Sequence, residues 1–123
     1  MVFLNVYQIC SLPLGYGIYH TAVEYDDIEY SFGIVNNNSG VYEMKPKTNN
    51  VGVFIKSIQL GHKTRREFFT GVEKIIKSYN SKSYNLLTNN CNHFTNDYLK
   101  KEFGKEIPSE FQSFLKLGEM LRM

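Results

Sequence analysis

The pattern of apolar residues changes once along this chain, at Thr64, and the change restricts the folds open to it. Before Thr64, short runs rich in β-branched and aromatic residues predict strands. After Thr64, apolar residues recur at the spacing of helices that bury one face. Strands followed by helices, with no internal repeat, predict an α+β domain in which the helices pack against one antiparallel sheet.

The first half of the chain predicts a series of strands. Residues 2–9 consist mostly of β-favouring residues and predict a strand covered on both faces. Asp26 and Asp27 predict a tight turn between the two strands of an antiparallel hairpin. In chain order, the expected strands span residues 2–9, 18–25, 28–33, 41–44 and 53–60.

The second half predicts helices. Thr64-Arg65-Arg66-Glu67 has the form of a capping box, so the first helix begins there. After a short extended segment at 84–88, a second helix over 91–103 ends before Gly104. Ser109-Glu110-Phe111-Gln112 is a second capping-box pattern and predicts a final helix. Its apolar stripe would consist of Phe111, Phe114, Leu115 and Leu121.

Length and charge limit the function classes. A chain of 123 residues is long enough for one hydrophobic core, so we expect a single domain over 1–123. The net charge of +2 falls short of a nucleic-acid-binding patch, and no nucleic acid is expected as a ligand. Residues 1–4 lack the basic start of a signal peptide, and no apolar run approaches the roughly 18 residues of a membrane span. We expect a cytoplasmic protein, with the nucleus also open.

Cys91 is the strongest candidate for chemistry. At the start of the expected helix 91–103, free backbone N–H groups and the helix dipole favour thiolate over thiol. The alternative is that Cys91 is a small buried apolar residue. Cys10 and Cys91 lack the spacing of a metal site, so both are expected to be free thiols and no metal or cofactor is predicted.

A nucleophilic cysteine needs a base, and the chain has three histidines. His93 follows Cys91 by two residues and would point about 200° away on a helix, which predicts a structural role. His62 lies in a polar loop and is expected to be incidental. His20 lies in the strand 18–25, where it is either a structural histidine of the sheet or a base that faces Cys91.

Eight short motifs, spread in order over nearly the whole chain, resemble one known family. They are Leu4-Asn5-Val6-Tyr7, Gly17-Ile18-Tyr19-His20, Glu29-Tyr30-Ser31-Phe32-Gly33, Ser39-Gly40-Val41-Tyr42-Glu43, Leu60-Gly61, Tyr84-Asn85-Leu86-Leu87, Asn90-Cys91-Asn92-His93-Phe94 and Gly104-Lys105-Glu106-Ile107-Pro108. In order and spacing these motifs resemble the PPPDE family of thiol isopeptidases, which includes the deSUMOylating isopeptidases.

The resemblance implies both a fold and an activity. The fold would be a circularly permuted papain-like α+β domain. Cys91 falls on the family's nucleophile and His20 on its general base, as a Cys-His dyad. The implied reaction removes a ubiquitin-like modifier, SUMO or ubiquitin, by cleaving the amide or isopeptide bond after its C-terminal glycine.

Other groups of the implied site are less determined. The backbone N–H of Cys91 is the natural first donor to the oxyanion. The side-chain amide of Asn85 or of Gln8 could be the second, although packing or turn roles are equally open. No acid is clearly placed to orient His20, because Asp27 and Glu29 are close by in the hairpin but Glu29 is expected to be exposed.

The chain also departs from the usual family pattern. Gln8 stands where the family usually has aspartate, and Ser109-Glu110-Phe111 stands where a tryptophan is usual. The segments 7–20 and 33–39 are shorter than usual, which leaves substrate choice open. Some members are dimers. The apolar residues of the expected final helix could supply such a surface or could pack in the core.

Two other functions remain open on the same fold. Lecithin retinol acyltransferase and its relatives carry a similar helix start after a histidine-bearing strand, so an acyltransferase or thioesterase is one alternative. Those enzymes would be expected to carry a hydrophobic membrane anchor, whereas residues 116–123 are short and polar. The other alternative is a non-catalytic binding module.

Overall fold

The computed structural model describes residues 1–11, 17–35, 38–80, 82–86 and 88–113. In the described part, five strands form one antiparallel sheet in the order β4-β3-β2-β1-β5. The strands are β1 (Val2–Ser11), β2 (Gly17–Tyr25), β3 (Ile28–Val35), β4 (Asn38–Met44) and β5 (Val53–Gly61). The helical elements are α1 (Arg65–Ile76), α2 (Cys91–Phe103) and the short 3-10 helix η2 (Ser109–Phe111).

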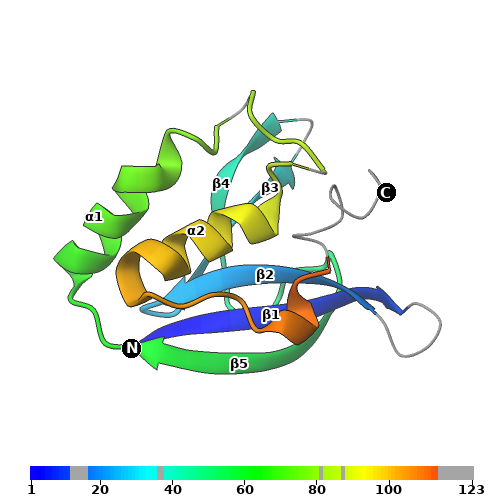
Figure 1. The fold of residues 1–123 in the computed structure, drawn as a ribbon, viewed down its shortest axis with the longest axis horizontal. Coiled ribbons are helices and arrows are strands. Elements are labelled where there is room, and N and C mark those ends of the chain that lie inside the picture. Colours follow the sequence, from blue (N-terminus) through cyan, green and yellow to red (C-terminus); the bar gives the residue numbers. More distant parts are fainter. Residues whose placement is uncertain (12–16, 36–37, 81, 87, 114–123) are drawn as a thin grey trace.

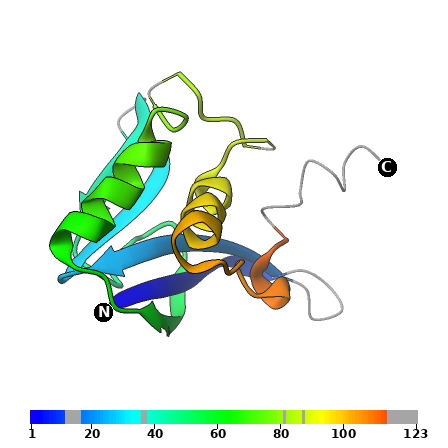
Figure 2. The same ribbon diagram turned by 60° about the vertical axis from the view of Figure 1, so that its left-hand side comes forward.

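Figures 1 and 2 show α2 lying across β2, with α1 beside it. The sheet and the two helices confirm the predicted α+β arrangement. The predicted circular permutation of a papain-like fold stays a prediction.

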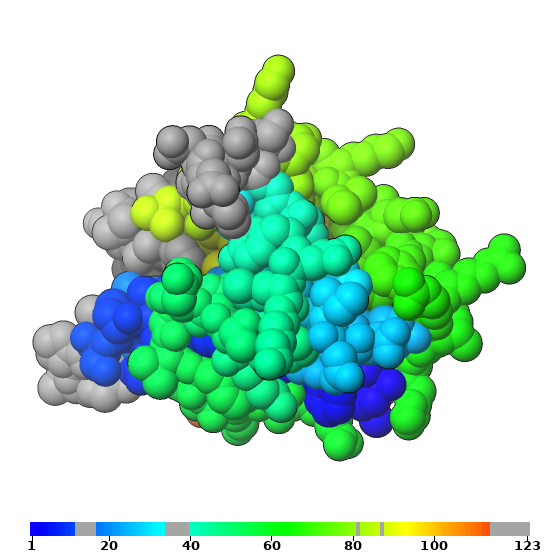
Figure 3. Space-filling model, turned by 180° about the vertical axis from the view of Figure 1, so that it is seen from behind, coloured from blue at the N-terminus to red at the C-terminus, as the bar shows by residue number. Residues whose placement is uncertain are grey.

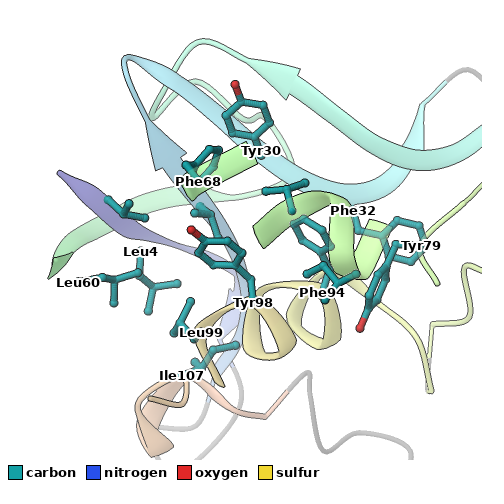
Figure 4. Close-up of a cluster of buried hydrophobic side chains, with 14 of the residues drawn as sticks. Leu4, Tyr30, Phe32, Leu60, Phe68, Tyr79, Phe94, Tyr98, Leu99 and Ile107 are labelled. Carbon is teal, nitrogen blue, oxygen red and sulfur yellow. The ribbon is translucent and has the colours of Figure 1, made fainter. Parts of the chain in front are cut away.

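The core fills the space between the sheet and the two helices. Val2, Leu4 and Val6 alternate along β1, which lies between β2 and β5, and contribute to the core from the side of the sheet. Figure 4 shows the labelled side chains of both helices, including Phe68 and Tyr98, converging over the sheet. Full burial of one such large side chain stabilises the fold by about 1.5–3 kcal/mol, so this cluster holds α2 firmly in place.

Local signals fixed the helix ends as expected. Thr64 Oγ1 accepts from the Glu67 N–H and the Glu67 carboxylate accepts from the Thr64 N–H, which confirms the first capping box. Asn90 caps α2, and Gly104 ends it with φ of 62°. That left-handed conformation suits glycine, which has no Cβ to clash. The Asp26-Asp27 turn is also present, with both residues at positive φ.

The second capping-box prediction is wrong. Ser109 begins a 3-10 turn after Pro108 and makes no side-chain capping bond. Gln112 instead donates from Nε2 to the Ile107 carbonyl. Phe111 is buried and packs edge-on against Tyr19, with ring centroids 4.9 Å apart. The rest of the expected helix, including Phe114, Leu115 and Leu121, lies outside the described residues, so the dimer surface stays a prediction.

The prediction of a short extended segment over residues 84–88, before Cys91, is also wrong. Asn85 and Asn89 exchange both backbone hydrogen bonds, at 3.1 and 2.9 Å, so the chain turns back on itself between them. The Asn85 Oδ1 accepts from the Thr88 N–H inside this turn at 3.1 Å.

The sheet is split on one side of β2. β1 pairs with β2 from Val2 to Ser11, but β3 pairs with β2 only through Val23, Glu24 and Tyr25. The edge of β2 before Val23 is therefore left for another element, and the start of α2 packs there.

Within the described part of the chain, no helix has the length and hydropathy needed to cross a membrane.

Candidate active site

Cys91 is the first residue of α2 and is 3% exposed. The Asn90 Oδ1 caps the helix by accepting from the backbone N–H groups of Asn92 and His93, at 3.0 and 3.3 Å. The side chain of His93 reaches back, and its Nδ1 accepts from the Asn90 N–H at 3.0 Å. His93 therefore has a structural role in the cap, as its position relative to Cys91 predicted.

Asn92 joins the start of α2 to the free edge of β2. Its Oδ1 accepts from the backbone N–H of Thr21 at 3.0 Å and from the Thr21 hydroxyl at 2.6 Å. Its Nδ2 donates to the Tyr19 carbonyl at 2.9 Å. This one amide takes the place of a neighbouring strand. Because Tyr19 and Thr21 flank His20, Asn92 clamps the strand on both sides of the candidate base.

His20 is 3% exposed and lies on the sheet face turned away from α1 and α2. It pairs across the strands with Tyr7, and the two ring centroids are 5.6 Å apart. Its Nε2 is 3.2 Å from the Nδ2 of Asn49, a buried residue of the segment between β4 and β5. Figure 3 shows that this segment and its flanking strands, coloured teal to green, form much of the molecule's back surface.

Two tyrosines lie near the candidate groups, Tyr84 near Cys91 and Tyr42 near the Asn49 amide that contacts His20. Burial, together with the nearby Cys91 and Tyr42, raises the pKa of Tyr84 to about 12. The hydroxyl of Tyr42 in turn accepts from the Asn49 amide, which contacts His20. Tyr42 is therefore close both to Tyr84, which lies near Cys91, and to the Asn49 amide that contacts His20.

Both candidate groups are neutral near pH 7. Burial raises the pKa of the Cys91 thiol to about 12, although the N–H groups of Thr21, Asn92 and Cys91 itself act in the opposite direction. Burial lowers the pKa of His20 to about 4. The expected thiolate at the helix start is therefore wrong for this structure, because loss of hydration outweighs the helix N–H groups.

The buried neutral state of His20 predicts that stability falls as the pH drops from 6.5 towards 4. In this range the unfolded chain binds a proton at His20 that the folded chain does not, which lowers the free energy of unfolding by up to about 3 kcal/mol. Chemical denaturation near pH 7 and near pH 4 measures the loss. It should be smaller for His20→Gln than for the wild type, and equal losses would contradict a neutral His20.

Glu29 is fully buried, so its expected exposure is wrong. Its carboxylate accepts from the Tyr7 hydroxyl at 2.7 and 2.9 Å, from Asn5 Nδ2 at 2.9 Å and from the Lys47 N–H at 3.1 Å. Tyr7 stands between Glu29 and His20, so this acid anchors the tyrosine. Asp27 is exposed at the hairpin turn.

Comparison with known proteins decides the family. A family model described as "PPPDE putative peptidase domain" matches residues 1–122. The chain belongs to the PPPDE family. It is 33% identical to a DeSI-like protein of Arabidopsis thaliana, over 95% of this chain and 56% of that protein.

Two further relatives are similar to this PPPDE chain. A DeSI-like protein of Schizosaccharomyces pombe is 31% identical over 95% of the chain and 65% of its own length. A desumoylating isopeptidase 1 homolog of Caenorhabditis elegans is 33% identical over 88% of the chain and 36% of its own length. The PPPDE chain therefore spans between about a third and two thirds of the length of these relatives.

The candidate oxyanion residues of the PPPDE chain lie in two places. Gln8 is in β1, where its Nε2 donates to the Ser11 hydroxyl at 3.1 Å. Asn85 is exposed and lies in the turn before α2. His62 is exposed in the loop before α1. Among the residues with described positions, no three His, Cys, Asp or Glu side chains gather as a metal site.

Three polar residues of this PPPDE site were not singled out from the sequence: Asn49, Asn92 and Tyr7. Asn49 lies in an asparagine pair that resembles a solvated loop, and nothing local distinguishes it from Asn50. Asn92 follows the candidate nucleophile directly, and that position was the one available signal. Asn49 and its partner His20 are 29 residues apart in sequence, and Asn92 and its partner Thr21 are 71 residues apart.

Proposed function

We propose that this chain is a cysteine isopeptidase that removes a ubiquitin-like modifier, SUMO or ubiquitin, from proteins. Cys91 is its nucleophile and His20 its general base. The observation that carries the proposal is the Asn92 clamp, because it joins the residue beside the nucleophile to both neighbours of the base. Membership of a peptidase family and similarity to a protein named as a desumoylating isopeptidase homolog support it.

The reaction follows from these groups. The Cys91 sulfur attacks the carbonyl carbon while its proton passes to His20. His20 then protonates the leaving lysine amine, which departs and leaves a thioester on Cys91. The same histidine takes a proton from water, which attacks the thioester and releases the modifier's C-terminal carboxylate.

The oxyanion of the tetrahedral intermediate needs hydrogen-bond donors. The Cys91 backbone N–H at the start of α2 is the first donor. Asn85, in the turn that leads into α2, is the weaker candidate for a second one. Gln8 donates to Ser11 in this structure and would have to leave that bond to take the role.

Burial requires that ionisation accompany substrate binding. A thiol with a pKa of about 12 is almost fully protonated near pH 7. The extended C-terminus of the substrate must therefore reach Cys91. Its binding must also bring Cys91 and His20 into the arrangement in which His20 takes the thiol proton. The same burial is the observation that favours the alternative, a non-catalytic binding module on this fold.

The test uses SUMO and ubiquitin that carry an electrophile at the C-terminus, followed by intact mass. The wild type should form a covalent adduct with one of the two modifiers. Cys10→Ala should form it equally well, since Cys10 is the other, exposed free thiol, and Cys91→Ala should form none. An adduct on Cys91→Ala, or no adduct with either modifier, would overturn the proposal.

A further inference from the structure

The side chain of Asn49 makes three polar contacts although it is only 6% exposed. Its Oδ1 accepts from the Val51 N–H at 3.0 Å. Its Nδ2 is 3.2 Å from the Tyr42 hydroxyl and 3.2 Å from the Nε2 of His20. Asn49 thus connects the candidate base to β4 and to the segment that covers the back of the sheet.

The Val51 contact fixes which way the amide points. A backbone N–H can only donate, so the atom that faces it must be the amide oxygen. The amide nitrogen then faces His20, and it too can only donate. The Nε2 of His20 must therefore accept and carry no proton. A neutral imidazole with a bare Nε2 carries its proton on Nδ1.

We propose that Asn49 is a positioning residue that holds the resting His20 ring in its Nδ1–H tautomer. Histidine in water prefers the other tautomer, so the amide imposes this choice. The tautomer assignment stands on the geometry alone, whereas its catalytic consequence rests on the proposed isopeptidase function.

The consequence concerns the proton that leaves Cys91. His20 already holds one proton on Nδ1, so the S–H bond breaks and the new N–H bond forms at Nε2. That N–H would then point at the Nδ2 donors of Asn49. The Asn49 amide must therefore turn over so that its Oδ1 faces His20. This rotation breaks the hydrogen bond between Asn49 Oδ1 and the Val51 N–H. Asn49 therefore opposes protonation of His20 at Nε2 until the Asn49 amide has turned over.

The other groups around His20 are accounted for. Tyr7 from β1 faces the ring, and its hydroxyl is bound to Glu29 of β3. Tyr42 from β4 contacts the same amide as His20, and its hydroxyl can either donate or accept. Tyr84 lies near both Tyr42 and Cys91. Lys47 reaches Glu29 through its backbone N–H.

Aspartate at position 49 should reverse the preference. A carboxylate has the same shape but two acceptor oxygens, so it can accept from Val51 and from a protonated Nε2 at once. Asn49→Asp is therefore expected to move the His20 proton to Nε2 and to raise the pKa of His20. Asn50→Asp is the matched control, because it adds the same charge at the exposed neighbouring residue.

Long-range ¹H–¹⁵N spectra of the protein with ¹⁵N-labelled histidine distinguish the two tautomers. The His20 signals are assigned from their loss in His20→Gln. We expect Nδ1–H at His20 in the wild type and in Asn50→Asp, and Nε2–H or a doubly protonated ring in Asn49→Asp.

An Nε2–H ring in the wild type would overturn the inference without any variant, and so would a folded Asn49→Asp that keeps Nδ1–H.

A second experiment measures kcat/KM against pH for a SUMO or ubiquitin C-terminal amide. Its acid limb should move to higher pH in Asn49→Asp and not in Asn50→Asp. If the spectra agree and no protein hydrolyses either amide, the proposed function fails while the assignment of Asn49 stands.

Discussion

Replacing His20 by alanine is expected to lower kcat/KM for a SUMO or ubiquitin C-terminal amide by about 10²–10⁴-fold, the range of one general acid-base group. The Cys91 thiol has a pKa of about 12, so near pH 7 it reacts only if a neighbouring base removes its proton. The clamp on Tyr19 and Thr21 holds the strand that carries His20 against the start of α2. Without the imidazole, neither the attack nor the departure of the amine has a proton carrier.

Single-turnover hydrolysis by His20→Ala and by His62→Ala measures this effect. His62 is exposed in the loop before α1 and should lose nothing on substitution. Because His20 is buried, the folded fraction of each variant is first determined by thermal unfolding and the rates are corrected for it. A corrected rate within a few fold of the wild type would remove His20 from the mechanism.

The features that the sequence predicted well depend on residues near one another in the chain. The Thr64 and Glu67 side chains bond to each other's backbone, and Gly104 ends α2 by its own conformational freedom. The Asp26-Asp27 turn is equally local. Such signals set the start of α1 and the end of α2, whereas β4 begins at Asn38 and not at residue 41, and the capping-box pattern at Ser109 begins only a 3-10 turn.

The errors at the candidate site arose where residues distant in sequence meet. Glu29 was expected at the surface, but the segment after β4 covers it and supplies the Lys47 N–H. The thiolate expected at Cys91 depends on hydration, which the packing of α2 against β2 removes. Asn49 has a role only because its amide meets His20 in space. Periodicity and propensity contain no information on these contacts.

Replacing Asn92 by alanine is expected to lower the free energy of unfolding by about 3 kcal/mol, because the Thr21 N–H and the Tyr19 carbonyl lose their partner in a buried site. No strand can replace the amide, since β3 pairs with β2 only from Val23 onward. The loss is a large part of a marginal total stability. Activity should fall further than stability, because the start of α2 is no longer held against β2.

Asn96→Ala is the matched control for Asn92→Ala. Asn96 is a buried asparagine of the same helix, and its Oδ1 accepts from one backbone N–H, that of Ile107, at 2.9 Å. One lost bond should cost about 1 kcal/mol, so urea denaturation should rank Asn92→Ala well below Asn96→Ala. Hydrolysis by the folded fraction should be near normal in Asn96→Ala and strongly reduced in Asn92→Ala. Equal rates in the two variants would mean that the clamp stabilises the fold without aligning Cys91 with His20.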